Sequence, residues 1–511
     1  MLAKIKTCSI YGLQVTETEV EVDIANGLPA MNIVGLADIA LKESKERVRA
    51  AMNNSGFEFP LKRITINLSP ASTKKEGTHF DLPIALGLLA ASGQVELGDY
   101  SRTIVLGELS LDGEINYVNG ALPMLLELSS NGYEKVILPF QNLEEAKLVK
   151  GLRCIGVNSL NELISFIKGE RELETFIGNK IEELTHDEFG ENFSDLKGQD
   201  NLKRGLEIAA AGCHNLFMVG PPGTGKTMAA RRLPSILPRL TFEEAMEITK
   251  IYSISGLLEP GSGLITQRPF RYPHHTLSAV SLIGGGRVPK PGEVSLSHNG
   301  VLFLDELPEF NKNVLELLRQ PLEDGWVTIS RSNGVFTYPA RFMLISSMNP
   351  CPCGYYGVED GVHRCSCTPY QVNQYSRRIS GPLLDRMDIL IETTLVSYDD
   401  LTNKKTRVTS EAIRQRVENA RQIQLQRYRK TKFMFNSDLT PSAVKKYCKL
   451  DVGSQKILSR AYEKMKLSAR AYNRIIKITR TIADLDGCDN IKIEHLAEAL
   501  QYRNVSNLFG R

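Results

Sequence analysis

The sequence predicts a three-part α/β protein, in which an α+β domain precedes an α/β core with a parallel sheet and a helical C-terminal subdomain. Three observations predict this organisation. From residue 1 to 168, β-like runs alternate with helix-like stretches; from 195 to 395, a strand, a glycine-rich loop and a helix are followed by further apolar strands; from 396 to 511, the pattern becomes helical. The intervening residues 169–194 are acidic and poor in strand formers, which is typical of a linker.

Composition limits the class of protein. The 511 residues include 62 Lys+Arg and 59 Asp+Glu, so a nucleic acid would have to meet a local basic surface. A hydrophobic fraction of 42% excludes a largely disordered chain. The most apolar stretch, 80–93, is shorter than the roughly 20 residues that span a bilayer. Because residues 1–12 also lack the apolar run of a secretion signal, we expect a cytoplasmic protein without a membrane partner.

The elements of the first and last parts follow from hydrophobic spacing. β-branched and apolar runs predict strands, and apolar residues at helical intervals predict helices. In the first part, strands are expected at 20–24, 63–68, 103–106 and 135–138, and helices at 39–53, 82–91 and 122–130. In the last part, helices are expected at 411–430, 441–448, 455–467, 469–485 and 493–501.

The α/β core begins with an apolar strand and a loop that fits G-x-x-x-x-G-K-[ST]. The loop consists of Gly220, Pro221, Pro222, Gly223, Thr224, Gly225, Lys226 and Thr227. Its glycines let backbone N–H groups point at a phosphate, and the following helix presents its positive end there. Lys226 would neutralise phosphate charge and Thr227 would hold Mg²⁺, so the loop predicts an ATP site.

Two further strands end in polar side chains that suit this site. Asp305 and Glu306 follow the apolar run 301–304. Asn349 follows the run 342–346. In an open parallel sheet, these strand ends should lie beside the phosphates. Asp305 would orient Mg²⁺, Glu306 would act as general base on water, and Asn349 would sense the γ-phosphate. The alternatives are a strand that simply ends in acids and an asparagine that only caps a turn.

With these residues the chain resembles an AAA+ ATPase. Longer phrases resemble the magnesium-chelatase-like branch: RYPHH at 271–275, LIGGG at 282–286, HNGVLFLDE at 298–306 and SGPLLDRMD at 380–388. Nearly the whole chain is similar to the YifB/ComM family. The resemblance implies an AAA+ P-loop core with an all-α lid, ATP and Mg²⁺ as cofactors, and a homo-hexameric ring. It also implies a motor on single-stranded or branched DNA, a branch-migration helicase in recombination and natural transformation.

The resemblance implies two further arginines. Arg386 in LLDRMD matches the arginine that reaches a neighbouring subunit's nucleotide, where a guanidinium neutralises charge on the transferred phosphoryl group. The alternative is that Arg386 pairs with Asp385 or Asp388 of its own subunit. Arg470 in LSARAYNR matches the lid arginine that contacts nucleotide, and Arg474, one turn away, is the other candidate.

Two inserted segments are candidate DNA contacts. The glycines 284–286 precede Arg287 and Lys290, and Ser332-Asn-Gly334 between two β-rich runs is a strong hairpin signal. Hairpins at these two places line the pore in related ring helicases, so Arg287, Lys290 and Arg331 are predicted to contact the DNA backbone. A solvated or subunit-interface hairpin is the alternative. The basic stretch 411–432 is a third candidate, although a charged helix is more often a solvated face.

Four of the nine cysteines are grouped in one segment. Cys351, Cys353, Cys365 and Cys367 form two C-x-C pairs around eleven residues rich in glycine and tyrosine. Four thiolates can close a tetrahedral Zn²⁺ shell, so a structural Zn²⁺ is predicted, with His363 as a substitute ligand. Metal-free thiols and a redox-labile pairing are the alternatives.

The first domain resembles the peptidase domain of Lon proteases over residues 69–92 and 104–138. Lon uses a serine activated by a lysine. At the matching positions this chain has KEGTHFD at 75–81 and NGALPM at 119–124, so we expect the fold without protease activity. Besides the DNA motor, the sequence therefore leaves one competing function, a chelatase-type ATPase that remodels a protein partner without DNA. Insertion of Mg²⁺ into a porphyrin is disfavoured, because no tetrapyrrole pocket is evident.

Overall fold

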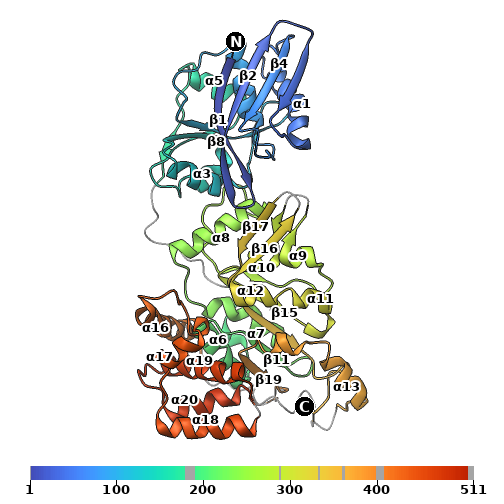
Figure 1. The fold of residues 1–511 in the computed structure, drawn as a ribbon, viewed down its shortest axis with the longest axis vertical. Coiled ribbons are helices and arrows are strands. Elements are labelled where there is room, and N and C mark those ends of the chain that lie inside the picture. The colour runs from blue at the N-terminus through green and yellow to red at the C-terminus, as the bar shows by residue number, and fades with distance from the viewer. Residues whose placement is uncertain are drawn as a thin grey trace.

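The computed structural model describes residues 2–178, 190–286, 289–331, 334–358, 363–396, 398, 408–465 and 467–503. The α+β domain lies at one end, the α/β core in the middle and the C-terminal helices at the other end (Figure 1). Across these described ranges, no helix combines the length and the apolar character that a bilayer crossing requires.

The N-terminal domain is built on a mixed sheet of eight strands in the order β10-β9-β8-β5-β1-β2-β4-β3. The strands are β1 (Leu2–Tyr11), β2 (Gln14–Ala25), β3 (Ala30–Val34), β4 (Arg63–Ser69), β5 (Thr103–Val105), β8 (Lys135–Pro139), β9 (Arg153–Val157) and β10 (Thr175–Ile177), with a separate pair β6 (Glu108–Leu109) and β7 (Ile115–Asn116). The helices are α1 (Ile39–Asn54), α2 (Asp81–Ala91), α3 (Ala121–Ser130), α4 (Leu143–Ala146) and α5 (Leu160–Ile167). The strands and helices predicted in this domain are confirmed.

Strand β2 shows how the sequence gives this sheet one apolar and one charged face. Val20 and Val22 are fully buried, whereas Glu19 and Glu21, which alternate with them, form ion pairs with Lys4 of β1 at 2.8 and 2.9 Å. Successive strand residues point to opposite faces, so this alternation buries one row of side chains and leaves the other in water.

Strand β10 lies within residues 169–194, which the sequence predicted to be a linker. It pairs antiparallel with β9 at the edge of the N-terminal sheet, so part of 169–194 belongs to that domain. The strand has only three residues, and its backbone hydrogen bonds do not depend on an apolar sequence. Acidic composition alone therefore gave the wrong assignment for these residues.

The α/β core contains a parallel sheet of five strands in the order β12-β15-β18-β11-β19. Its strands are β12 (Phe270–Arg271), β15 (Gly300–Leu304), β18 (Phe342–Met348), β11 (Leu216–Val219) and β19 (Ile389–Glu392). Every residue of β11 and β15 is buried, as expected for a parallel sheet covered on both faces. Because β18 lies between β11 and β15, the carboxyl ends of these three strands are neighbours.

Short helices and two hairpins surround this sheet. The helices are α6 (Asp200–Gly212), α7 (Lys226–Arg232), α8 (Phe242–Ser255), α9 (Ala279–Ile283), α10 (Glu293–Leu296), α11 (Lys312–Glu316), α12 (Arg319–Asp324), α13 (Pro369–Ser376) and α14 (Gly381–Leu384). The hairpins are β13 (Gly284–Gly285) with β14 (Lys290–Pro291) and β16 (Trp326–Arg331) with β17 (Gly334–Pro339).

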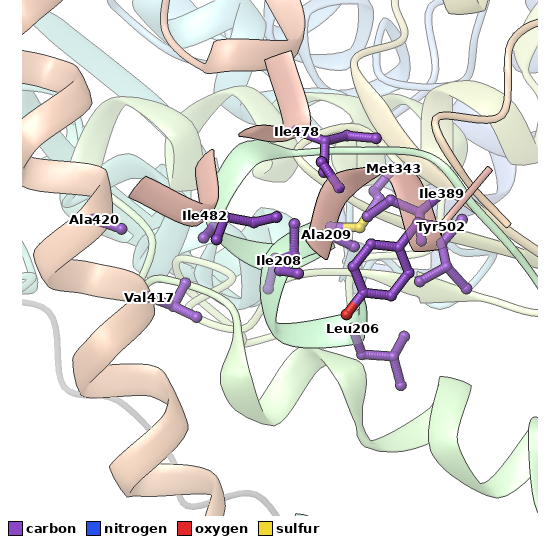
Figure 2. Close-up of a cluster of buried hydrophobic side chains, with 14 of the residues drawn as sticks. Leu206, Ile208, Ala209, Met343, Ile389, Val417, Ala420, Ile478, Ile482 and Tyr502 are labelled. Carbon is purple, nitrogen blue, oxygen red and sulfur yellow. The ribbon is translucent and has the colours of Figure 1, made fainter. Parts of the chain in front are cut away.

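The described part of the C-terminal region is helical. It contains α16 (Ser410–Tyr428), α17 (Pro441–Tyr447), α18 (Val452–Lys464), α19 (Ala469–Leu485) and α20 (Ile493–Gln501). Figure 2 shows that α16 and α19 share one apolar cluster with α6 and the core sheet, including Ile208, Ala209, Met343, Ile389, Val417, Ile478 and Ile482. The C-terminal helices are therefore packed on the core through a continuous hydrophobic interior.

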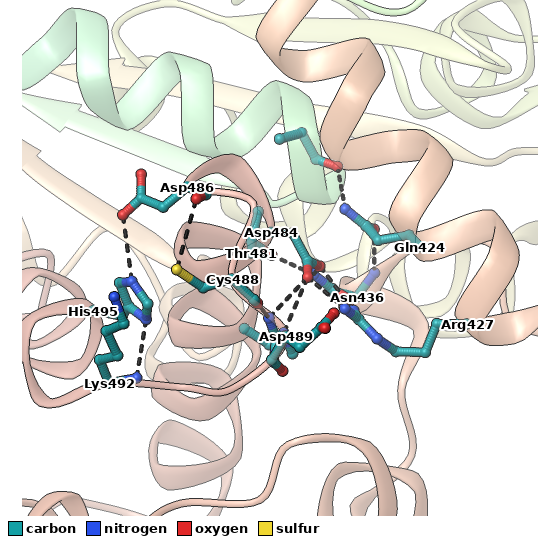
Figure 3. A network of polar contacts seen from close by, with 12 residues as sticks. Gln424, Arg427, Asn436, Thr481, Asp484, Asp486, Cys488, Asp489, Lys492 and His495 are labelled. Atoms are coloured by element: carbon teal, nitrogen blue, oxygen red, sulfur yellow. Dashed lines mark hydrogen bonds and ion pairs between the residues drawn. The ribbon is translucent and has the colours of Figure 1, made fainter.

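A buried carboxylate reinforces this packing (Figure 3). Asp484 of α19 accepts hydrogen bonds from both terminal nitrogens of Arg427 at 2.8 and 2.5 Å, and from Asn436 Nδ2 at 2.9 Å. A buried charge is tolerated only where partners of this kind replace its water. On the same helix α16, Gln424 donates to the carbonyl of Ala211 at 2.9 Å and so joins the helix to α6.

Among the described residues, the N-terminal domain contacts the core at several places, and two of these contacts involve α8 and the β16–β17 hairpin. The backbone N–H of Gly120 donates to the carbonyl of Ser253 in α8 at 3.0 Å, and the Ser253 hydroxyl donates to Glu145 at 2.7 Å. The turn between β1 and β2 meets the β16–β17 hairpin, where the rings of Tyr11 and Phe336 lie 4.6 Å apart in an edge-to-face arrangement. Both contacts join elements distant in sequence.

Candidate nucleotide site

The loop after β11 takes its shape from its glycines. A Cβ at Gly220 would lie 2.1 Å from the hydroxyl of Thr393, so only glycine fits at the end of the strand. Gly223 and Gly225 have φ angles of 77° and 82°, in the left-handed region that glycine adopts at low cost. Thr224 donates to the carbonyl of Pro221 at 3.0 Å, which closes the loop on itself.

Lys226 lies at the centre of this loop. Its Nζ donates to the carbonyls of Gly220 at 2.6 Å and Pro221 at 2.9 Å, and to Oδ1 of Asn349 at 3.2 Å. Burial lowers the pKa of Lys226 to about 8, and the charges of Asp305 and Glu306 only partly oppose this effect. A buried ammonium held by neutral oxygens is well placed to pair with an anionic phosphate chain.

The end of β15 supplies the carboxylate that faces the loop. Thr227 Oγ1 donates to Asp305 Oδ2 at 2.7 Å, and the Tyr272 hydroxyl donates to the same oxygen at 3.2 Å. Ser347 of β18 donates to the other oxygen of Asp305. A hydroxyl beside a carboxylate is the donor set that Mg²⁺ takes in nucleotide sites, so Thr227 and Asp305 could hold this ion.

Glu306 is exposed next to this carboxylate. Its φ angle of 52° lies in the left-handed region, which is unusual for a residue with a side chain. Such strain persists where the surroundings enforce it and is concentrated at functional sites. The structure thus brings together Lys226, Thr227, Asp305 and Asn349, and it leaves Glu306 free to meet water at their edge.

Arg386 and Arg470 lie in another part of the molecule. Both line a cavity of about 700 Å³ between the core and the C-terminal helices, and none of its described lining residues belongs to the phosphate loop. Arg386 pairs with Glu323 of α12 and donates to the carbonyl of Pro382 at 2.8 Å. Arg386 is thus paired within its own subunit, as the alternative expected, but with Glu323 and not with Asp385 or Asp388. Burial and the nearby cations Arg319, Arg470 and Arg474 lower the pKa of Arg386.

Asp388 and Arg474 have a structural partnership in this cavity. The Arg474 guanidinium lies 3.0 Å from Asp388, and His214 also faces this carboxylate at 3.3 Å. Although burial opposes it, the hydrogen bond from His214 and the charge of Arg474 lower the pKa of Asp388 to about 2. Arg474 is thus already engaged, whereas Arg470 is exposed at the start of α19.

The two hairpins predicted as DNA contacts lie against each other. The Tyr338 hydroxyl of β17 donates to the carbonyl of Pro289 at 2.6 Å. A Cβ at Gly285 would lie 3.0 Å from the Arg331 guanidinium, so Arg331 covers the glycine segment. Arg331 and Lys290 are both exposed. Arg287 lies outside the described residues.

Helix α16 has an exposed face, but several of its arginines also have partners within the protein. Arg416 pairs with Glu207 of α6, and Arg427 pairs with Asp484. Arg421 stacks on the ring of Phe435, with its guanidinium carbon 3.5 Å from the ring centre. The Arg416 pair joins α16 to the core, and the other two contacts lie within the C-terminal region. Arg429, Lys430 and Lys432, which follow the helix, are exposed, so DNA contact by this stretch stays a prediction.

The four grouped cysteines do meet in space. Cys351, Cys353, Cys365 and Cys367 have their sulfurs within 4.8 Å of one another and could hold a metal ion. His363 is not in this group, because its ring stacks on Tyr355 with 4.4 Å between centroids.

Sequence reasoning missed three residues of these sites. Tyr272 and Ser347 contact Asp305, and Glu323 pairs with Arg386. Tyr272 lies within the phrase RYPHH, and Ser347 lies at the end of a strand already predicted to face the phosphates, so both had a usable signal. Glu323 had none, because its pairing depends on how α12 packs.

The comparisons with known proteins agree with this geometry. Models for the magnesium chelatase subunit ChlI match residues 192–401 and 20–142, and a model for its C-terminal part matches residues 407–503. The chain is 42% identical to competence protein ComM of Haemophilus influenzae over all of this chain and 99% of that protein. It is 42% identical to YifB of Escherichia coli over 99% and 98% of the two chains. The magnesium-chelatase 38 kDa subunit of Rhodobacter capsulatus is 26% identical over 31% of this chain and 50% of its own.

Proposed function

Because the chain belongs to the magnesium-chelatase-like AAA+ family that includes ComM and YifB, we propose that it is an ATPase whose hydrolysis drives movement on DNA. We further propose that it works in the cytoplasm as a homo-hexameric ring and promotes branch migration during recombination of incoming DNA. The observation that carries the ATPase proposal is the joining of Lys226 to Asn349 and of Thr227 to Asp305, which unites the phosphate loop with two strand ends.

Each residue of this site has a defined task. Lys226 pairs with the β- and γ-phosphates. Thr227 and Asp305 would hold a Mg²⁺, which would supply neutralisation of the remaining phosphate charge. Glu306 takes a proton from the attacking water at its carboxylate, which makes the oxygen a better nucleophile. Asn349, hydrogen-bonded to Lys226, changes partner when the γ-phosphate arrives and leaves, so it reports the state of the nucleotide.

A neighbouring subunit completes the site. Arg386 and Arg470 share a cavity whose described lining excludes the phosphate loop of their own chain. A ring would bring this cavity against the nucleotide of the next copy. Arg386 then leaves Glu323 and neutralises charge on the transferred phosphoryl group, while Arg470, exposed beside it, contacts the same phosphates. A lone subunit therefore hydrolyses ATP slowly.

The DNA contact is proposed at the two adjoining hairpins. Arg331 and Lys290 are exposed cations there, and Arg287 lies between the strands β13 and β14 in sequence. Cations of this kind bind the phosphate backbone without reading the base sequence. This position suits a motor that moves along any DNA.

The chelatase models and the R. capsulatus subunit favour one second candidate, an ATPase that remodels a protein partner without DNA. The discriminating experiment is the rate of ATP hydrolysis with single-stranded, duplex and branched DNA, with Glu306→Gln as the inactive control. We expect DNA to increase the rate, most strongly with branched DNA. A rate that DNA leaves unchanged in assembled rings would favour the remodelling function.

A further inference from the structure

The cysteine group has the geometry of a tetrahedral metal site. The sulfur of Cys351 lies 3.3 Å from that of Cys353 and 3.7 Å from that of Cys365, and Cys353 and Cys365 are 3.6 Å apart. A tetrahedron with metal–sulfur bonds of about 2.3 Å has edges of about 3.8 Å. The three separations are close to that edge and well beyond the roughly 2.05 Å of a disulfide bond.

The surroundings of the sulfurs also suit a metal. Cys351 is fully buried, and the other three cysteines are half-buried. The backbone N–H of Tyr356 donates to the Cys351 sulfur at 3.3 Å, a contact that stabilises negative charge there. Four thiolates this close repel one another unless a cation lies between them, and soft sulfur ligands in a tetrahedral set select Zn²⁺.

The cysteine segment touches the nucleotide site from two directions. Cys351 follows Asn349 by two residues, so fixing its sulfur fixes the chain that carries this side chain. A Cβ at Gly354 would lie 2.7 Å from Cδ of Pro222, which places the segment directly against the phosphate loop. Gly357, three residues further on, has open space around it.

We propose that Cys351, Cys353, Cys365 and Cys367 bind one Zn²⁺. By fixing the cysteine segment, this ion braces the phosphate loop and the Asn349 side chain. The metal takes no part in the chemistry. It replaces the hydrophobic core that the segment lacks and so holds Pro222 and Asn349 at fixed positions. The bracing role rests on the proposed ATPase function, whereas the metal site does not.

Metal content tests the site itself. Full-length protein purified without chelator or metal-affinity resin should contain about one Zn²⁺ per chain by mass spectrometry. The double variant Cys353→Ser/Cys367→Ser should lose it, and Cys488→Ser, at a cysteine outside the group, should keep it. Wild-type protein reconstituted with Co²⁺ should show the intense visible absorption of tetrahedral thiolate coordination, a readout that does not depend on how the variants fold. Absence of metal in the wild type together with absence of that absorption would overturn the proposal.

Thiol counting separates the alternatives in the same samples. Nine free thiols per denatured, metal-free chain are expected. A deficit of two or four thiols would show disulfide pairing within the group and would contradict a metal site.

A glycine pair tests the bracing. Gly354→Ala should keep its Zn²⁺ but bind an ATP analogue at least about tenfold more weakly, because the new methyl group displaces Pro222. Gly357→Ala introduces the same backbone strain, at a φ of 79° instead of 88°, without a contact, so its affinity should match the wild type. Equal affinities for the two variants would overturn the bracing role. Because metal content and analogue binding do not require turnover, failure here is distinguishable from failure of the ATPase proposal.

Discussion

The phosphate loop and the arginine cavity differ in how complete they are within one chain. Around the loop, Lys226 is hydrogen-bonded to Asn349 and to the carbonyl of Gly220, and Thr227 is hydrogen-bonded to Asp305. In the cavity, Arg386 is held by Glu323 in a cluster of cations, with its buried Nε unpaired among the described residues. The residues around the loop thus have partners within their own chain, whereas the guanidinium of Arg386 is only partly satisfied there, and this difference is what the proposed completion of the site by a second copy would explain.

Of the changes to the two sites, removal of Arg386 should reduce ATP hydrolysis the most. Arg386→Ala is expected to reduce ATP hydrolysis by about 10³-fold or more while ATP binding is retained, because the guanidinium acts on charge that develops only during transfer. Arg378→Ala is the matched control, since Arg378 pairs with exposed Glu309 at 3.0 Å and should leave the rate unchanged. Steady-state hydrolysis and analogue binding provide the two measurements.

Mixtures of two inactive variants test whether Arg386 acts on the nucleotide of another copy. Rings formed from Arg386→Ala and Lys226→Ala chains should hydrolyse ATP faster than either variant alone. Some subunit interfaces in the mixed rings combine an intact phosphate loop with an intact Arg386. Mixtures that only average the two single variants would show that the halves do not meet.

Loss of Lys226 should affect binding as well as turnover. Lys226→Ala is expected to slow hydrolysis by at least about 10²-fold and to weaken nucleotide binding, because no other side chain contacts the loop carbonyls with a positive charge among the described residues. Fluorescent ATP-analogue titration checks the affinity. Near-wild-type affinity in this variant would contradict the proposed phosphate contact.

The two arginines of α19 should separate stability from activity. Arg474→Ala is expected to lower the free energy of unfolding by about 1–3 kcal/mol, because it leaves Asp388 without its ion pair. Arg470→Ala should leave stability unchanged and slow hydrolysis by about tenfold. Urea unfolding and ATP turnover should be measured on both variants. If Arg474 were the nucleotide contact, Arg474→Ala and not Arg470→Ala would be the variant that slows hydrolysis.

The smallest effect concerns pH. In the free protein the pKa of Lys226 is lowered from 10.5 to about 8, and a bound phosphate chain favours the protonated form. Nucleotide affinity should therefore be constant below about pH 8 and fall by up to about tenfold per unit above it, with proton uptake on binding. Lys226→Arg, which stays protonated, should show a flat profile in calorimetry, and a wild-type profile equally flat would contradict the lowered pKa.

The sequence predicted the residues around the phosphate loop better than the contacts of the arginine cavity, for a physical reason. The spacing of Lys226 and Thr227 is local, and Asp305 and Asn349 follow apolar strands whose parallel pairing fixes where they end. The ion pair of Arg386 with Glu323 spans 63 residues and depends on helix packing that periodicity does not encode.

The fold shows the same division between local and long-range information. Helices such as α19 were predicted within a residue or two from their apolar spacing. Strand β10 was taken for linker, because an edge strand of three residues has no pattern of its own. The ion pairs of the basic helix α16 were not predictable for a similar reason, since the partners of Arg416 and Arg427 come from α6 and α19.

The edge-to-face contact between Tyr11 and Phe336 has a mechanical consequence. A Cβ at Gly12 would lie 2.7 Å from the Phe336 ring, so the turn that carries Tyr11 leaves the aromatic side chain no slack. If the β16–β17 hairpin moves, it has to carry the first domain with it or break this contact. The N-terminal domain is therefore coupled to the position of this hairpin through the aromatic contact.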